Sequence, residues 1–208
     1  MKKGIFITFE GIDGAGKSTQ INMLRSYLEE KGKTVVVTRE PGGTDIGSKI
    51  RTLLLDKSNT GMRGMTELLL YYADRAQHID EFILPELNSG KCVICDRYYD
   101  SSYAYQLAGR GIDISALDKL NDMVVKNIKP DATFLLDIPP DSSESRIVSR
   151  GGEKDRMEDE AHSFKCSVRN GFIKQAKLHP ERIHVIDAMQ SPEKIFDEIL
   201  LCLDNMEL

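Results

Sequence analysis

The sequence predicts an α/β fold, a five-stranded parallel sheet with helices on both faces. Two observations support this prediction: strand-like and helix-like segments alternate along the whole chain, and a glycine-rich segment joins the first strand to the first helix. Alternating strands and helices form parallel sheets, whose ligands lie beyond the carboxyl ends of the strands. A chain of 208 residues has the length of one ordinary domain, so residues 1–208 are expected to form a single domain.

The first βαβ unit consists of a buried strand at 5–9, a helix from Gly16 to Lys31 that ends at Gly32, and a strand at 34–38 rich in β-branched residues. A Pro-Gly-Gly turn at 41–43 precedes a helical segment at about 45–56 and a long amphipathic helix at about 63–87. The remaining segments are a strand at 92–95, a polar, tyrosine-rich segment at 98–111, a helix near 115–127, a strand at 133–137, a basic segment at 146–156, a helix at about 158–178, a strand at 182–187 and a helix from Pro192.

Charge and hydropathy argue against nucleic-acid and membrane partners. Charged residues make up 29% of the chain and are mixed in sign, without a block of five or six like charges that could bind nucleic acid. Met1-Lys2-Lys3 resembles the start of a signal peptide, but the apolar run at 5–9 is too short to complete one. No transmembrane stretch follows. We therefore expect a cytoplasmic protein.

Cys92 and Cys95 have a spacing that occurs in zinc sites and redox motifs. They lie in a short apolar run, and neither a second cysteine pair nor a nearby histidine completes a ligand set. Burial as small hydrophobic residues within a strand is therefore the favoured interpretation.

The segment Gly11-Ile-Asp-Gly-Ala-Gly-Lys-Ser18 matches the P-loop pattern G-x-x-x-x-G-K-[ST] and lies between a predicted strand and a predicted helix. In such a loop the backbone N–H groups and the helix N-terminus bind phosphates. Lys17 should reach the β- and γ-phosphates, and the Ser18 hydroxyl should bind Mg²⁺. The predicted ATP-binding residues are Gly11, Ile12, Asp13, Gly14, Ala15, Gly16, Lys17, Ser18 and Thr19.

Asp96 and Arg97 follow the third predicted strand. In a P-loop fold this strand neighbours the strand of the loop, which would place Asp96 near the Mg²⁺ and Arg97 near the transferred phosphate. A surface Asp-Arg pair is the alternative. The Asn-Lys-x-Asp run that many GTPases use for guanine does not occur in the chain.

Several separate motifs resemble those of bacterial thymidylate kinases. They are Phe9–Ser18, Thr38–Thr44, Tyr71–Arg75, Asp96–Gln106, Gly109–Gly111 and Pro130–Asp131. The resemblance extends from the first strand to the last. It implies a P-loop nucleoside monophosphate kinase fold, transfer of the γ-phosphate of ATP to thymidine monophosphate (dTMP), a requirement for Mg²⁺, and a homodimer.

The resemblance also implies roles for an acceptor-binding region at about 39–75 and for residues beyond it. Arg75 matches an arginine that donates to a thymine carbonyl, at a position where cytosine carries an amino donor. Tyr71 matches the aromatic residue that stacks on thymine, Arg97 the arginine that binds the acceptor phosphate, and Tyr105 a ring beneath the sugar that excludes a 2′-hydroxyl. The full set implied for dTMP is Asp13, Glu40, Pro41, Arg51, Tyr71, Arg75, Arg97, Ser101, Ser102, Tyr105 and Gln106.

A lid is expected at about 142–157. Phosphoryl transfer needs a cation near the transferred group, and eukaryotic relatives place an arginine directly after the P-loop acid, where this chain has Gly14. The cation should therefore come from the lid, with Arg150 and Arg156 favoured over Arg146; a solvated charged loop is the alternative. The expected catalytic residues are Lys17, Arg97, Arg150, Arg156 and Asp13, and the expected metal ligands are Ser18 and Asp96.

Two other functions compete with this prediction. A kinase for another nucleoside monophosphate, or for a deoxynucleoside, would keep the P-loop and change the pocket around Arg75 and Tyr105. A nucleotide-dependent switch that hydrolyses ATP slowly would need neither the base-reading arginine nor the Asp96-Arg97 pair.

Overall fold

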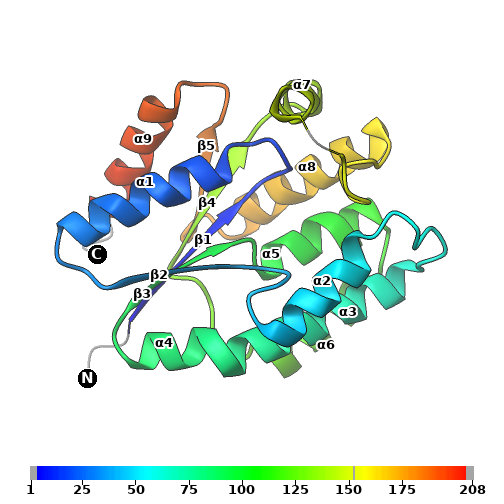
Figure 1. Cartoon of the computed structure of the whole chain (residues 1–208), viewed down its shortest axis with the longest axis horizontal. Helices are drawn as coiled ribbons and strands as arrows, with labels where there is room; N and C mark the ends of the chain where they lie inside the picture. Colours follow the sequence, from blue (N-terminus) through cyan, green and yellow to red (C-terminus); the bar gives the residue numbers. More distant parts are fainter. Residues whose placement is uncertain (1–3, 152, 205–208) are drawn as a thin grey trace.

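The fold is a five-stranded parallel sheet in the order β2-β3-β1-β4-β5, which confirms the predicted class (Figure 1). The computed structural model describes residues 4–151 and 153–204. Its strands are β1 (Ile5–Glu10), β2 (Val35–Arg39), β3 (Cys92–Asp96), β4 (Ala132–Asp137) and β5 (Ile183–Asp187). The start of the chain, Met1 to Lys3, lies outside the described residues. None of the described helices is long and apolar enough to cross a membrane.

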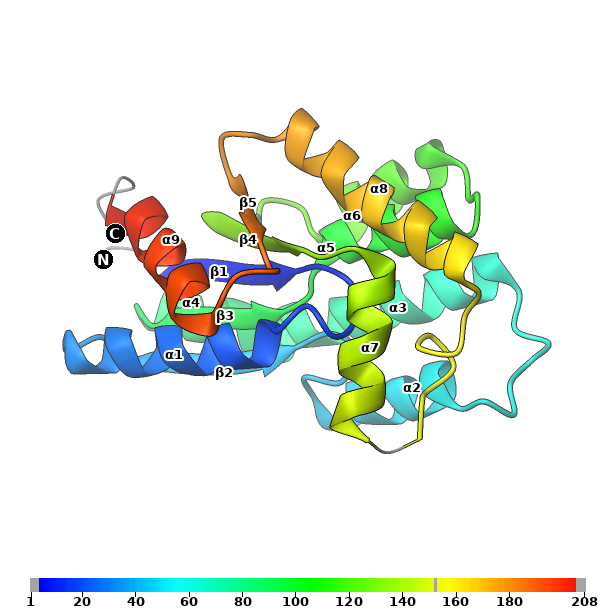
Figure 2. The same cartoon turned by 90° about the horizontal axis from the view of Figure 1, so that it is seen from above.

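Helices cover both faces of the sheet, and α1 packs with α9 on one of them (Figures 1 and 2). The helical segments are α1 (Lys17–Glu30), α2 (Asp45–Leu55), α3 (Gly64–His78), η1 (Ile79–Ile83), α4 (Leu84–Asn88), α5 (Tyr99–Ser102), η2 (Tyr103–Gly109), α6 (Ile114–Val124), α7 (Pro140–Arg150), α8 (His162–Leu178) and α9 (Pro192–Asp204). Most lie within a few residues of their predicted bounds.

Three segments differ from the prediction. A helix, α7, includes the first residues of the basic segment at 146–156. The helix expected at 63–87 is interrupted at η1 by a π-helical turn, and the segment at 98–111 is mostly helical, forming α5 and η2. Its tyrosines and serines show no clear apolar period, so the sequence pattern gave no helix there. Packing against α8 explains the helix: the Tyr105 ring contacts Phe164 and Phe172, with centroids 6.2 and 6.0 Å away.

The carboxyl ends of β1, β2 and β3 meet at one edge of the sheet. Asp96 of β3 pairs in register with Phe9 of β1 and Arg39 of β2. The P-loop, the Glu-Pro-Gly-Gly loop and the Asp96-Arg97 pair therefore start side by side. On β3, Cys92 and Cys95 are buried free thiols, as predicted.

Candidate active site

The P-loop runs from the end of β1 to the start of α1. Gly11, Gly14 and Gly16 all have positive φ, at 131°, 77° and 95°. A Cβ at Gly11 would lie 2.4 Å from the Leu136 carbonyl oxygen, so this turn requires glycine. The buried Lys17 ammonium donates to the carbonyls of Gly11 and Ile12, at 3.1 and 3.3 Å. Burial lowers the pKa of Lys17, and the nearby positive charge of Arg97 lowers it further, by a smaller amount.

The cavity at the P-loop contains the two predicted metal ligands. Ser18 and Asp96 both line it, as does Lys17. The Asp96 Oδ1 atom is buried and has no hydrogen-bond partner among the residues that the structure describes. A buried, unpartnered carboxylate oxygen and a hydroxyl in the same cavity fit Mg²⁺, which typically takes one or two protein oxygens and completes its shell with phosphates and water.

Arg97 points from the end of β3 toward the P-loop. Its φ of 72° lies in the left-handed region, which a residue other than glycine seldom adopts. The guanidinium donates to the Gly11 carbonyl (2.8 Å), to Asp13 Oδ1 (2.8 Å) and to Ser101 Oγ (3.4 Å), and it lies 5.1 Å from the centroid of the Tyr105 ring. Burial raises the pKa of Asp13, but the charges of Arg97 and Lys17 outweigh this effect and hold it at about 2. Asp13 is therefore ionised at neutral pH.

Glu10, which the sequence analysis did not identify, holds the backbone that follows Arg97. Its buried carboxylate accepts the Tyr98 N–H (2.8 Å) and the Ser101 hydroxyl (2.6 Å). Burial, with a smaller effect from Asp100, raises the pKa of Glu10 to about 7. Glu10 thus fixes the turn that presents Arg97 and Ser101.

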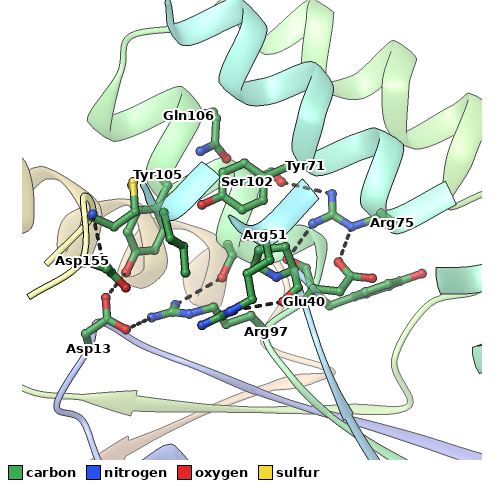
Figure 3. Close-up of a pocket in the computed structure, with 15 residues that line it drawn as sticks. Asp13, Glu40, Arg51, Tyr71, Arg75, Arg97, Ser102, Tyr105, Gln106 and Asp155 are labelled. Atoms are coloured by element: carbon green, nitrogen blue, oxygen red, sulfur yellow. Dashed lines mark hydrogen bonds and ion pairs between the residues drawn. The ribbon is translucent and has the colours of Figure 1, made fainter. Parts of the chain in front are cut away.

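A second cavity, here called the acceptor cavity, adjoins the P-loop and brings together the residues predicted for the acceptor (Figure 3). It contains all eleven of them: Asp13, Glu40, Pro41, Arg51, Tyr71, Arg75, Arg97, Ser101, Ser102, Tyr105 and Gln106. They come from six segments: the P-loop, the loop after β2, α2, α3, the turn after β3 and the α5–η2 stretch. Leu55, Tyr98, Asp155 and Met157 complete the lining.

Arg75 is fixed at the base of this cavity. It is 1% exposed and donates to Glu40 Oε2 (2.7 Å), Ser102 Oγ (3.1 Å) and the Tyr98 carbonyl (3.2 Å). These bonds use three of the five guanidinium N–H groups, one from each nitrogen, and leave one on each terminal nitrogen for a ligand. Glu40 also pairs with His78 Nδ1 at 3.0 Å, and His78 Nε2 contacts Thr38 Oγ1 at 2.7 Å.

The remaining walls combine an aromatic ring with polar groups. Tyr71 lies one turn before Arg75 on α3, and Tyr105 hydrogen-bonds Asp13 Oδ2 at 3.4 Å. Arg51 donates to the Pro41 carbonyl at 2.9 Å. Burial and the charge of Arg39 lower the pKa of Arg51. The cavity thus has an aromatic wall, a buried arginine at its base, and Arg97 and Asp13 at the end nearest the P-loop.

Comparison with known proteins decides the family. The family model described as "Thymidylate kinase" matches residues 9–199. The chain belongs to the thymidylate kinase family. It is 47% identical over 206 residues to the thymidylate kinase of Vesicomyosocius okutanii, covering 99% of this chain and 100% of that protein. The thymidylate kinase of Thermoanaerobacter sp. (strain X514) is 46% identical over 198 residues, with 95% and 96% covered.

A solved structure supports the same assignment. The crystal structure of thymidylate kinase from Ehrlichia chaffeensis superposes with a TM-score of 0.78 at 40% identity, covering 97% of this chain and 99% of that one. The five-stranded sheet and its covering helices are therefore those of a thymidylate kinase.

The segment expected to form a lid, at about 142–157, comprises most of α7 and the stretch that follows it (Figure 2), and its residues Asp155 and Met157 line the acceptor cavity. Arg150, at the end of α7, lines the P-loop cavity, is 58% exposed at its side chain and pairs with Glu158 Oε1 at 2.6 Å. Arg146 lines the same cavity and donates to the Ala188 carbonyl (2.8 Å) and the Gly14 carbonyl (3.4 Å). Gly151 has a φ of 74°, and its neighbour Gly152 lies outside the described residues.

Arg156 occupies a different place from Arg150. It donates to the Leu54 carbonyl at 2.6 Å and to Glu67 Oε2 at 2.7 Å, and it is not among the described residues that line the P-loop cavity. Arg146, which the sequence analysis ranked behind it, does line that cavity. The α-helical turns between Pro140 and Arg146 bring Arg146 back over the P-loop, a position that sequence spacing alone does not predict.

Gly14 lies directly under α7. With a φ of 77°, a Cβ there would meet the Ser143 carbonyl oxygen at 2.8 Å and Ile147 Cγ1 at 3.3 Å. The Ser143 hydroxyl also donates to the Asp13 carbonyl at 2.6 Å. The start of α7 therefore occupies the space that a side chain at Gly14 would need.

Proposed function

We propose that this member of the thymidylate kinase family transfers the γ-phosphate of ATP to dTMP, giving dTDP and ADP. A phosphate oxygen of dTMP attacks the γ-phosphorus, and the bond from that phosphorus to the oxygen bridging the β-phosphate breaks. Such transfer depends mainly on in-line positioning and on stabilisation of the developing negative charge.

The acceptor cavity is proposed to hold dTMP with its base on the Arg75 side and its phosphate on the Arg97 side. Arg75 would donate its two remaining N–H groups toward a thymine carbonyl, with Tyr71 against the base. Arg97, helped by Arg51, would bind the phosphate, where a guanidinium can engage two oxygens at once. Asp13 would lie by the 3′-hydroxyl, and the Tyr105 ring would leave no room for a 2′-hydroxyl.

The donor site is proposed to use the P-loop and the lid. Lys17 would bind the β- and γ-phosphates, and Arg150, with Arg146 beside it, would approach the transferred group. Ser18 and Asp96 would hold Mg²⁺, which neutralises charge on the donor phosphates when bound. The lid at about 142–157 and the acceptor region at about 39–75 belong to one domain in this proposal.

The observation that most directly supports the reaction is the position of Arg75, buried at the base of a cavity that adjoins the P-loop. A coupled ADP-release assay with dTMP, UMP, CMP and GMP as acceptors tests it. We expect turnover with dTMP and little with the three ribonucleotides. Equal rates on any ribonucleotide would favour the alternative of another nucleotide kinase, and ATP turnover that ignores dTMP would favour a nucleotide-dependent switch.

We also propose that the protein is a cytoplasmic homodimer. Met65 and Leu69 lie one turn apart on α3 and are 45% and 50% exposed, and Met123 on the neighbouring α6 is 70% exposed. Exposed apolar side chains on adjacent helices favour a protein contact. A cytoplasmic location fits the proposed use of ATP and a nucleoside monophosphate as substrates.

A further inference from the structure

Glu67 on α3 is a buried carboxylate that joins three separate parts of the chain. It is 1% exposed and accepts Gln106 Nε2 on Oε1 (3.0 Å) and Arg156 on Oε2 (2.7 Å). Arg110 donates to both oxygens, at 3.1 and 3.0 Å. Burial raises the pKa of Glu67, but the donors from Arg110, Gln106 and Arg156 outweigh it and lower the pKa below its usual value. The carboxylate is therefore ionised at neutral pH.

Arg156 connects this carboxylate to the lid. Its Nε donates to the Leu54 carbonyl (2.6 Å), and its backbone N–H donates to the Leu55 carbonyl (3.1 Å), both at the end of α2. One arginine of the lid thus bridges the end of α2 and the start of α3. An arginine suits this place because its planar group can donate in two directions at once.

The residues on either side of Arg156 form part of the acceptor cavity. Asp155 and Met157 both line it, and so does Gln106, the third partner of Glu67. In Figure 3, Asp155 lies beside Asp13 and Tyr105. The Asp155 carboxylate in turn accepts the N–H groups of Met157 (2.8 Å) and Glu158 (2.9 Å), which holds the turn together.

A purely structural ion pair would also account for a buried Glu-Arg contact. Two features exceed that interpretation. The cluster joins the lid to helices that carry acceptor residues. Glu67 contacts Gln106 directly and Arg156 on its other oxygen, and Gln106 and both neighbours of Arg156 line the cavity. An ion pair that served stability alone would not need to lie between the lid and the acceptor cavity.

We propose that Glu67 and Arg156 are positioning residues that fasten the lid over the acceptor cavity, so that Asp155 and Met157 complete its wall. The proposal rests on the assignment of this cavity to dTMP. Arg156 then contributes to acceptor binding through its neighbours, while Arg150 acts at the transferred phosphate.

Steady-state kinetics of two lid variants separate these roles. For Arg156→Ala we expect the KM for dTMP to rise about tenfold, as for loss of a charge-assisted hydrogen bond, and kcat to change by less than about threefold. For Arg150→Ala we expect the opposite, a large fall in kcat with little change in that KM. A fall in kcat for Arg156→Ala with an unchanged KM would overturn the proposal.

Hydrogen exchange followed by mass spectrometry tests the contact between Glu67 and Arg156, here called the latch, without turnover. In nucleotide-free protein, the amides at 155–158 should exchange about tenfold faster in Arg156→Ala and Glu67→Gln than in wild type. Glu29→Gln, which breaks the exposed Arg25–Glu29 pair on α1, is the matched control and should leave them unchanged. Equal exchange in wild type and in Arg156→Ala would contradict the latch, even if Glu67→Gln fails to fold.

The two experiments also distinguish failure of the latch from failure of the proposed function. If the wild-type protein does not phosphorylate dTMP, the proposed reaction is wrong, and exchange at 155–158 still decides whether Glu67 and Arg156 hold the lid. If dTMP is phosphorylated and neither its KM nor the exchange responds to the variants, only the latch is wrong.

Discussion

At the scale of single residues, the backbone at Arg97 is the least usual feature of the site. Its left-handed φ of 72° is held by the Phe9 carbonyl, which accepts the Arg97 N–H at 2.9 Å, and by Glu10, which accepts the next N–H. A residue in a sparsely populated conformation persists where its surroundings over-determine it. Here these contacts direct the guanidinium toward Gly11 and Asp13.

Glu10 gives this site a dependence on pH. Because its folded-state pKa of about 7 lies above the ordinary value of 4.5, the stability that it contributes is fully present below pH 4.5 and is lost as pH rises to 7. For Glu10→Gln, which cannot ionise, the free energy of unfolding relative to wild type should therefore rise between pH 4.5 and 7, by on the order of 3 kcal/mol. Urea denaturation at both pH values measures this difference, and a constant difference would show that Glu10 titrates normally.

Arg150 is the residue on which the proposed catalysis most depends. It lines the P-loop cavity from an exposed position, so its removal should not disturb the fold. We expect Arg150→Ala to lower kcat by on the order of a thousandfold, as for loss of an arginine that stabilises the transferred phosphate. Arg25→Ala, which removes an arginine of similar exposure on α1, is the control. Near-normal turnover in Arg150→Ala would contradict the assignment.

At the scale of elements, the loop after β2 is packed directly against α3. Asp74 accepts the Gly42 N–H at 2.9 Å, and a Cβ at Gly43 would lie 2.4 Å from His78 Nε2 and 2.7 Å from Thr38 Oγ1. The contacts of Glu40 with Arg75 and His78 depend on this close approach. The Pro-Gly-Gly turn therefore sets the position of the arginine proposed to read the base.

Gly43→Ala tests this dependence. The added methyl group should push the loop away from His78, lower the free energy of unfolding by about 1–3 kcal/mol and raise the KM for dTMP. Gly61→Ala is the matched control, because a Cβ there has no neighbour within 4 Å. Thermal unfolding and initial rates measure both effects. Identical behaviour of the two variants would mean that the loop is not constrained by α3.

The elements also show what the sequence could and could not predict. All five strands lie within one or two residues of their predicted bounds, because each is a short apolar run beside turn residues. The helical stretch at 98–111 was missed because its stability comes from burial against α8, which is distant in the chain. Glu10, Glu67 and His78 were missed for a similar reason. Their hydrogen-bond partners lie 38 or more residues away in the sequence, and no local spacing marks such a contact.

At the scale of the whole molecule, exposed apolar side chains on α3 and α6 support the proposed homodimer. Leu69→Glu would place a charge in that surface, where an unpaired buried carboxylate is costly, and we expect it to give a single-chain mass by light scattering. Leu201→Glu, on α9 and of comparable exposure at 63%, should keep the mass of two chains. A dimer that survives Leu69→Glu would locate the contact elsewhere.

The packing of α7 on Gly14 bears on how this branch of the family could have diverged from relatives with an arginine at that position. An arginine at Gly14 would collide with Ser143 and Ile147 and would need an unfavourable φ of 77°. A chain of this type could therefore not acquire the loop arginine by one substitution while keeping α7 in place. Replacing the proposed lid arginine by an arginine at Gly14 would require α7 to shift as well.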